Sequence, residues 1–209
     1  MMSRGRPGGR RGVRPLVWPG VRIALLSAAA ALLLVSCGAP PLTLYTLGTP
    51  PKAANAAPLG KRPVVIAVAR VTIPDELDTE DIVVRDGSTL QRSHRGRWAS
   101  RLSLGVTDRL TERLAERWPD ALVTDRPLAE TPSYRVLVNI SRLDVSASGV
   151  ATLDADWLIV PRDGNAPARR NRLRFSVAGP VATDQDVVTL VGLLLDQLAG
   201  ALPRDLPKA

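Results

Sequence analysis

Cysteine and histidine are almost absent from this chain, which contains one of each, Cys37 and His94. A metal site built on several histidine or cysteine ligands is therefore excluded, and no disulfide can form within the chain. Aromatic residues make up only 3% of the sequence, so the core has to be built from valine, leucine, isoleucine and alanine. A glycine-rich phosphate loop with its lysine and a Gly-x-Ser-x-Gly nucleophile elbow are also missing. These absences argue against an enzyme.

Two weaker candidates for chemistry remain. His94 lies in a polar stretch, residues 91–97, which we expect to be an exposed loop, and no activated nucleophile accompanies the histidine. An acidic cluster in residues 75–81 has the oxygen ligands that a hard cation prefers, but it lacks the turn glycine and the regular spacing of a calcium loop. A solvated acidic loop is the better interpretation; its carboxylates are Asp75, Glu76, Asp78, Glu80 and Asp81.

The position of the single cysteine is the most informative feature of the chain. Cys37 follows an apolar segment, residues 23–36, whose last residues, Leu34, Val35 and Ser36, form a lipobox. Six arginines and no acidic residue precede the cysteine. A basic start, an apolar segment and small residues at the cut site are typical of an export signal. We expect cleavage before Cys37, diacylglycerol on its thiol and an acyl chain on the freed amine, a combination that anchors stably.

Two other interpretations of this segment stay open. The first is an ordinary signal peptide with an incidental cysteine, and the second is an uncleaved membrane anchor. The apolar stretch is shorter than the roughly 20 residues that span a bilayer, which favours lipidation. Gly38, in place of an aspartate, follows the cysteine, and in an enterobacterial-type sorting system this favours the outer membrane over the inner one.

The net charge of +8 mainly reflects the leader. Six of the 28 basic residues precede Cys37, which leaves 22 against 20 acidic residues, so a nucleic-acid partner has little support. We predict a signal peptide over residues 1–36, a lipid-anchored tether rich in proline and alanine over 37–62, and one folded domain over 63–209. An apolar island inside the tether, residues 42–47, has the composition of a short strand.

The periodicity of apolar residues predicts an α+β fold in a single domain. Its mainly antiparallel sheet has about five or six strands and is packed by two helices, near 98–118 and 184–201. The first helix has an apolar stripe at Leu102, Val106, Leu110 and Leu114. The second is expected to begin with a capping box over residues 183–186 and to bury Val187, Leu190, Val191, Leu194 and Leu198. Strands are expected at 64–73, at 82–85 with a hairpin partner at 88–91, and in three alternating runs near 134–140, 151–159 and 170–177. Pairing of the last two runs would place Asp154 and Asp156 opposite Arg172 and Arg174.

A series of arginines interrupted by a tryptophan is the candidate partner interface. Arginine and tryptophan are enriched where proteins bind one another. Such a surface would face lipid headgroups or an acidic partner, and the alternative is a solvated loop with the first turn of a helix. The residues of this candidate interface are Arg85, Arg95, Arg97, Trp98 and Arg101.

The order of short motifs along the chain resembles the PqiC-like family, the ABC-type transport auxiliary lipoproteins. A lipobox precedes residues 44–47, an apolar strand ends in Ile73 and Pro74, and the Asp-Glu-Leu-Asp of 75–78 follows. After these come the Ile-Val-Val-Arg of 82–85, an Arg-Trp-Ala at 97–99, a leucine-rich helix and a strand that starts with Tyr134. The resemblance covers nearly the whole chain after Cys37.

This resemblance implies an accessory, non-catalytic role. Such lipoproteins work beside a periplasmic protein with MCE domains, an inner-membrane permease and an ATPase, which together move lipids between membranes. The lipoprotein is expected to dock this machinery at the outer membrane, with a homo-oligomeric ring as one arrangement. Two alternatives stay open: a carrier that binds lipid between its helices and sheet, and a lipoprotein that assists outer-membrane assembly.

Overall fold

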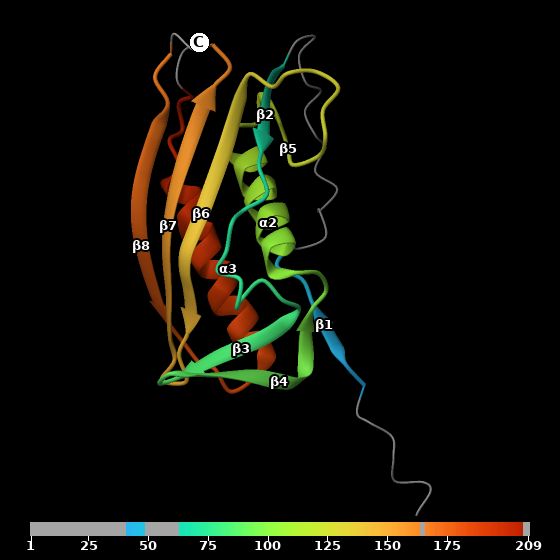
Figure 1. The fold of residues 1–209 in the computed structure, drawn as a ribbon, viewed down its shortest axis with the longest axis vertical. Coiled ribbons are helices and arrows are strands. Elements are labelled where there is room, and N and C mark those ends of the chain that lie inside the picture. The colour runs from blue at the N-terminus through green and yellow to red at the C-terminus, as the bar shows by residue number, and fades with distance from the viewer. Residues whose placement is uncertain (1–40, 49–62, 164–165, 207–209) are drawn as a thin grey trace, which may run out of the picture. The chain divides into compact units, whose positions relative to one another are not determined.

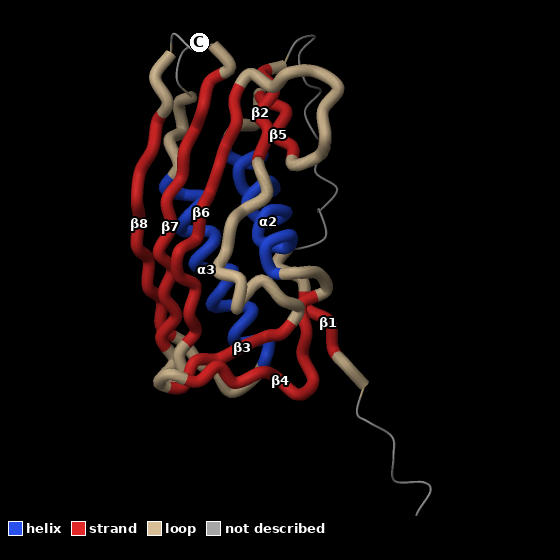
Figure 2. The backbone as a smooth tube through the Cα atoms, viewed as in Figure 1, coloured by secondary structure: helices blue, strands red, loops and turns tan. Residues whose placement is uncertain are grey.

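Two sheets and two helices make up the part of the chain that the computed structural model describes, residues 41–48, 63–163 and 166–206. The small sheet has the strand order β1-β4-β3 and the large sheet has the order β5-β2-β6-β7-β8. Figure 2 shows the small sheet running across one end of the long strands of the large sheet. The helices are α2 (Leu102–Arg117) and α3 (Asp184–Ala201). The strands are β1 (Thr43–Tyr45), β2 (Val64–Val68), β3 (Asp81–Asp86), β4 (Thr89–Trp98), β5 (Ala121–Thr124), β6 (Tyr134–Val145), β7 (Val150–Pro161) and β8 (Arg169–Ala178).

The α+β class, the single domain and the two helices are confirmed. The strands differ from the prediction, because the described residues contain eight strands in two sheets and not five or six in one. Both sheets are mixed, since β1 pairs with β4, and β2 with β5 and β6, in the parallel sense. The periodicity of a strand shows which residues face the core, but it carries no information on which distant strand lies beside it.

The three long strands of the large sheet follow the predicted alternation. Every second residue of β7 is buried, and so is every second residue of β6 from Tyr134 to Ile140. A register shift after Ile140 then moves the buried positions of β6 to Leu143 and Val145. The predicted register is confirmed: Asp154 lies opposite Arg174 and Asp156 lies opposite Arg172. Both helices pack on the buried face of this sheet and leave its other face uncovered (Figure 1).

Helix α3 begins and packs as the sequence predicted. The Thr183 hydroxyl accepts a hydrogen bond from the Asp186 backbone N–H, and the Asp186 carboxylate accepts one from the Thr183 N–H. This reciprocal pair satisfies two of the free amides at the helix start. The predicted apolar face is buried, with Val187, Leu190, Val191, Leu194 and Leu198 all at most 3% exposed.

Helix α2 starts later than predicted, at Leu102 and not near Trp98. Trp98 instead ends β4, where its backbone N–H donates to the Glu80 carbonyl at 2.8 Å. The sheet hydrogen bonds therefore extend the strand through residues that the sequence assigned to the helix. The predicted stripe of α2 is otherwise correct, because Leu102, Val106, Leu110 and Leu114 are at most 5% exposed.

Two further predictions on local structure were wrong. The stretch containing His94 is part of strand β4 and not a loop. The strand predicted over residues 64–73 ends at Val68. The pairing with β6 is interrupted where the Val71 N–H donates to the Thr107 hydroxyl of α2 at 2.9 Å, and it resumes as a single parallel bridge between Thr72 and Asn139. Strand β5 was not predicted, since four residues carry too little periodicity to be recognised.

The small sheet packs directly against the start of α3. Gly96 in β4 lies so close to Asp184 that a Cβ at this position would collide with the aspartate side chain. The neighbouring Ser93 hydroxyl donates a 2.9 Å hydrogen bond to the same carboxylate. Glycine at position 96 is therefore required for this close approach.

Among the described residues, no helix is long and apolar enough to cross a membrane.

Two leucines of α2 allow a test of the packing. Leu110 is 1% exposed and Leu104 is 41% exposed. We expect Leu110→Ala to lower the free energy of unfolding by about 2–5 kcal/mol, because the substitution removes buried apolar surface and leaves a cavity. Leu104→Ala should change it by less than about 0.5 kcal/mol. Urea unfolding of the purified proteins measures both changes, and equal effects would contradict the placement of the helix.

Candidate functional site

The predicted lipidation site lies outside the described residues. Cys37 and the lipobox residues Leu34, Val35 and Ser36 precede residue 41, where the described part of the chain begins, and lipidation therefore stays a prediction. The apolar island in the predicted tether is described, and it forms strand β1. This strand pairs in parallel with β4, with Leu44 opposite Arg97 and Tyr45 opposite Trp98.

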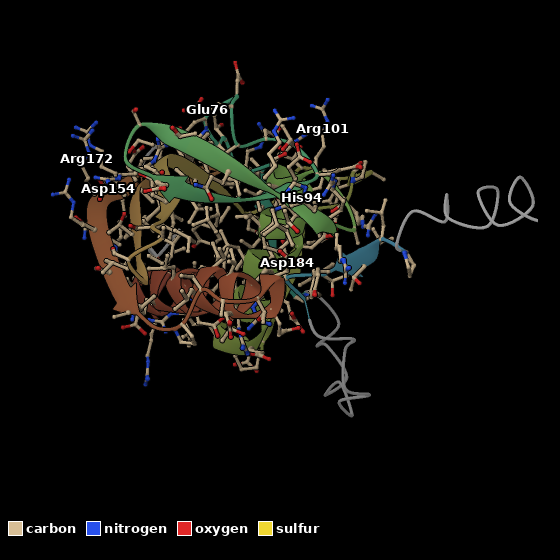
Figure 3. The ribbon with its side chains drawn as sticks, turned by 90° about the horizontal axis from the view of Figure 1, so that it is seen from below. Glu76, His94, Arg101, Asp154, Arg172 and Asp184 are labelled. Atoms are coloured by element: carbon tan, nitrogen blue, oxygen red, sulfur yellow. The ribbon has the colours of Figure 1, made fainter. Side chains whose placement is uncertain are left out.

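The structure separates the five residues of the candidate partner interface into three groups. Trp98 is 5% exposed and belongs to the core. Arg85 and Arg97 are half-buried and form ion pairs within the domain. Arg95 and Arg101 are exposed, and Figure 3 shows Arg101 pointing away from the domain. Of these five side chains, only the last two are freely available to a partner.

Arg85 connects the small sheet to the large one. Its Nε donates to Asp144 Oδ1 at 2.7 Å, and the second oxygen of Asp144 accepts a 2.8 Å hydrogen bond from Arg142 Nε. The Arg85 carbonyl also accepts a hydrogen bond from the Ala147 N–H. The side chain of Arg85 is 31% exposed and that of Asp144 is 13% exposed. These contacts give Arg85 a structural role at the junction of β3 with the end of β6.

The outer side of the small sheet carries a second shared carboxylate. Asp81 in β3 forms ion pairs with two arginines of β4, with Arg97 Nε at 3.1 Å and Arg92 Nε at 3.2 Å. Arg97 also donates from Nη1 to the backbone carbonyls of Ser93 and Gly96. One carboxylate thus faces two guanidinium groups, and exposed Arg95 adds a third cation on the same strand.

Asp78 caps the N-terminus of α2 from a distant loop. The residue before the helix, Arg101, makes no capping hydrogen bond with its side chain. In its place, Asp78 Oδ1 accepts the Ser103 N–H at 3.0 Å, and the Thr79 carbonyl accepts the Leu102 N–H. Burial alone would raise the pKa of Asp78, but the hydrogen bonds from Ser103, with help from nearby arginines, outweigh it and hold the pKa below its ordinary value.

The acidic stretch of residues 75–81 does not form a cation site. Asp78 caps a helix, Asp81 binds two arginines, and Glu76 projects outward from the domain in Figure 3. Within the described ranges, no three carboxylate, histidine or cysteine side chains are close enough together to hold a metal ion. Asp78 and Asp81 therefore act as partners of arginines and of a backbone amide.

An apolar cavity of about 300 Å³ opens between β1 and the start of α2. Its lining includes Tyr45, Leu47, Trp98, Leu102, Gly105 and Asp108. Burial and a hydrogen bond with Asp125 raise the pKa of Asp108. The cavity is next to the small sheet, and of the two helices only α2 contributes to its lining. It is therefore not the groove between helices and sheet that the carrier alternative requires.

The space between α2 and α3 is occupied by charged groups. Asp196 of α3 accepts paired hydrogen bonds from both Arg109 and Arg113 of α2, at 2.8–3.1 Å. The hydrogen bonds to Asp196 raise the pKa of Arg113 above its ordinary value. A hollow to which both helices contribute is lined by the charged residues Arg113, Glu116, Arg117, Asp196 and Arg204. Its polarity does not suit a lipid chain.

The uncovered face of the large sheet carries a cross-strand ion pair. Arg174 donates two hydrogen bonds to Asp154, at 2.6 and 2.8 Å, and these bonds lower the pKa of Asp154. Figure 3 shows Asp154 and Arg172 together, well away from His94 and Arg101. An exposed pair of this kind contributes to register more than to stability, so we assign it a structural role.

Comparison with known proteins identifies the fold and the family. An uncharacterized protein of known crystal structure is similar with a TM-score of 0.61 and 17% identity, over 77% of this chain and 95% of that one. A Xanthomonas campestris protein of the DUF330 family is similar with a TM-score of 0.55 and 15% identity, over 77% of this chain and 92% of that one. At such identities the likeness shows the fold alone. No curated protein matches the chain.

The family is shown by the sequence itself. The family model described as the ABC-type transport auxiliary lipoprotein component matches residues 45–202. This chain therefore belongs to that family, the auxiliary lipoprotein components of ABC-type transport. The match runs from the last residue of β1 to the residue after α3, so both sheets and both helices belong to the family domain.

The cap on α2 predicts a pH-dependent loss of stability. We expect Asp78→Ala to lower the free energy of unfolding by about 0.5–2 kcal/mol near neutral pH. Because the pKa of Asp78 is lowered from 3.8 on folding, its contribution is complete above that value and disappears as the pH falls below it. The difference from the unsubstituted protein should therefore shrink in acid. Glu76→Ala, which removes an exposed carboxylate, is the matched control, and a constant difference would contradict the cap.

The junction at Arg85 is tested by a double-mutant cycle. Arg85→Ala should lower the free energy of unfolding by about 1.5–3 kcal/mol, because it removes a charged hydrogen bond from a half-buried aspartate. Arg95→Ala, on exposed β4, should change it by less than about 0.5 kcal/mol. Combination with Asp144→Ala measures the coupling. Strictly additive losses would show that Arg85 does not act through Asp144.

Proposed function

We propose that this protein is a lipid-anchored, periplasm-facing subunit of an MCE-type lipid transport system that docks the machinery at the outer membrane. The observation that carries the proposal is the family match over residues 45–202, which spans the whole described domain from β1 to the end of α3. Auxiliary components of this family are lipoproteins of ABC-type transport. The role is non-catalytic.

The lipid on Cys37 supplies the first part of this function. The lipid restricts the domain to one membrane surface. This raises the effective concentration of the domain near partner proteins that lie in that membrane or extend to it. Two or more acyl chains give stable anchoring, whereas one gives marginal binding.

The partners in this proposal are a periplasmic MCE-domain protein, an inner-membrane permease and an ATPase. They follow from the sequence resemblance to the PqiC-like family and from the transport role of the family. A homo-oligomeric ring of this chain would present several domains to one conduit. The near balance of 22 basic and 20 acidic residues after Cys37 gives no support to a nucleic-acid partner.

The carrier alternative receives little support from the packing. The apolar faces of both helices are buried against the large sheet, with Leu114, Leu194, Leu195 and Leu198 at 0% exposure. A lipid chain would have to displace these side chains, at a cost of several kcal/mol in lost contacts. The domain is therefore better suited to act through its surface than by enclosing a lipid.

Affinity purification of the full-length protein from mildly solubilised envelopes of its native bacterium tests the proposal. We expect mass spectrometry to recover an MCE-domain protein with its permease and ATPase, because the anchor holds the lipoprotein beside them. Clean purification without these proteins, in cells that express them, would contradict the docking role. Recovery of the machinery for lipopolysaccharide or barrel assembly would support the assembly alternative.

Cys37→Ser is the matched control in the same cells. It should leave a folded domain that is released from membranes by high salt and carbonate, with much weaker recovery of the transport proteins. Persistence of this variant in the washed membrane would disprove the lipid anchor.

A further inference from the structure

Two exposed leucines stand on one side of strand β1. Leu44 is 64% exposed and Leu42 is 59% exposed, the highest values among the large apolar side chains that the structure describes. They are two residues apart, so they share one face of the extended chain. The residue between them and the one after them point the other way, and Tyr45 packs against the core. Single exposed leucines are common, but a pair on one edge strand is an apolar contact surface.

Arginines lie next to these leucines on the same side of the small sheet. The parallel register places Leu44 opposite Arg97, and two residues earlier it would place Leu42 beside Arg95. Arg92 lies further along and shares Asp81 with Arg97. We call this surface the β1 face; it comprises Leu42, Leu44, Arg92, Arg95 and Arg97. The face thus carries three guanidinium groups and one carboxylate, Asp81, which pairs with Arg92 and Arg97 and leaves Arg95 exposed.

The length of the chain before β1 limits how far this face can lie from the lipidated residue. Leu42 is five residues after Cys37. A fully extended chain covers at most about 3.6 Å per residue, so their Cα atoms are within about 18 Å of each other in any conformation. If Cys37 carries its acyl chains in the bilayer, the β1 face must stay close to the headgroups.

We infer that the β1 face lies against the membrane, with its two leucines in the interface and its exposed arginines, Arg92 and Arg95, on the phosphate groups of anionic phospholipids. This inference rests on the lipid anchor of the proposed function. Apolar side chains flanked by cations are the combination that binds membrane surfaces, and guanidinium groups make strong paired hydrogen bonds to phosphate. Contact of this face with the bilayer would orient the domain, so that the uncovered face of the large sheet and α3 remain accessible from the periplasm.

A fluorescence measurement on the lipidated protein tests the orientation. Because Cys37 is the only cysteine and its thiol is blocked by lipid, an introduced cysteine is the only free thiol. Leu44→Cys carries an environment-sensitive NBD label on the β1 face. Leu193→Cys is the matched control, since Leu193 is a 47% exposed leucine on α3. Both proteins are reconstituted in phosphatidylethanolamine vesicles that contain phosphatidylglycerol and a nitroxide-labelled lipid.

The expected result is a blue shift and nitroxide quenching at position 44, with neither effect at position 193. Arg95→Gln, combined with Leu44→Cys, should reduce the ratio of docked to undocked domains about fivefold, because one cation near an anionic surface is lost. Arg170→Gln, on exposed β8, is the matched charge control and should leave the signal unchanged. Phosphatidylcholine vesicles or high salt should weaken the signal as Arg95→Gln does.

Three outcomes would overturn the inference. Quenching could be equally weak at positions 44 and 193 in a protein whose intact mass shows the lipid. This result would disprove contact between the β1 face and the membrane, and it would leave the lipid anchor supported. An intact mass without lipid would reject the anchor and this orientation together. A solvent-exposed label at position 44 that becomes protected only when the native transport proteins are added would assign the face to an acidic protein partner.

Discussion

The N-terminus of α2 is satisfied by a carboxylate from another part of the chain, and much of the domain is organised around this contact. Arg101 precedes the helix without capping it, so Asp78 and the Thr79 carbonyl accept the amides of Ser103 and Leu102. The segment that contains Asp78 follows β2 of the large sheet and leads into β3 of the small sheet. A single stretch of backbone therefore holds both sheets and one helix in place. Free amides at a helix start need such partners.

Shared carboxylates then determine which arginines are structural and which are available. Three aspartates each bind two guanidinium groups: Asp81 binds Arg92 and Arg97, Asp144 binds Arg85 and Arg142, and Asp196 binds Arg109 and Arg113. Each of these clusters joins two elements. The Asp81 and Asp144 clusters keep one unit of positive charge, whereas Arg109 and Arg113 also pair with Glu112 and Glu116 and leave no excess of positive charge. The cluster on the small sheet stands beside the exposed leucines of β1, and that combination of charge and apolar surface distinguishes it from the other two.

The pairing of β1 with β4 changes how the predicted anchor relates to the fold. Composition alone predicts a flexible tether from residue 37 to 62, but residues 43–45 of that stretch form a strand paired with β4. The link between the predicted lipid site and the first strand is therefore only a few residues long. A short link restricts the orientations that the domain can take at a membrane, whereas a tether of the predicted length would leave the domain free to rotate.

Features that depend on neighbours in sequence were determined by the sequence alone. The capping box and buried face of α3, the leucine stripe of α2 and the register of β7 with β8 all follow from residues that are close together or joined by one short turn. Tertiary structure decided the rest: the parallel partners of β1 and β2, the end of β2 at Val68, and the structural roles of Arg85 and Trp98. Arg85 and Asp144 are 59 residues apart, and local periodicity carries no information about which distant groups will meet when the core closes.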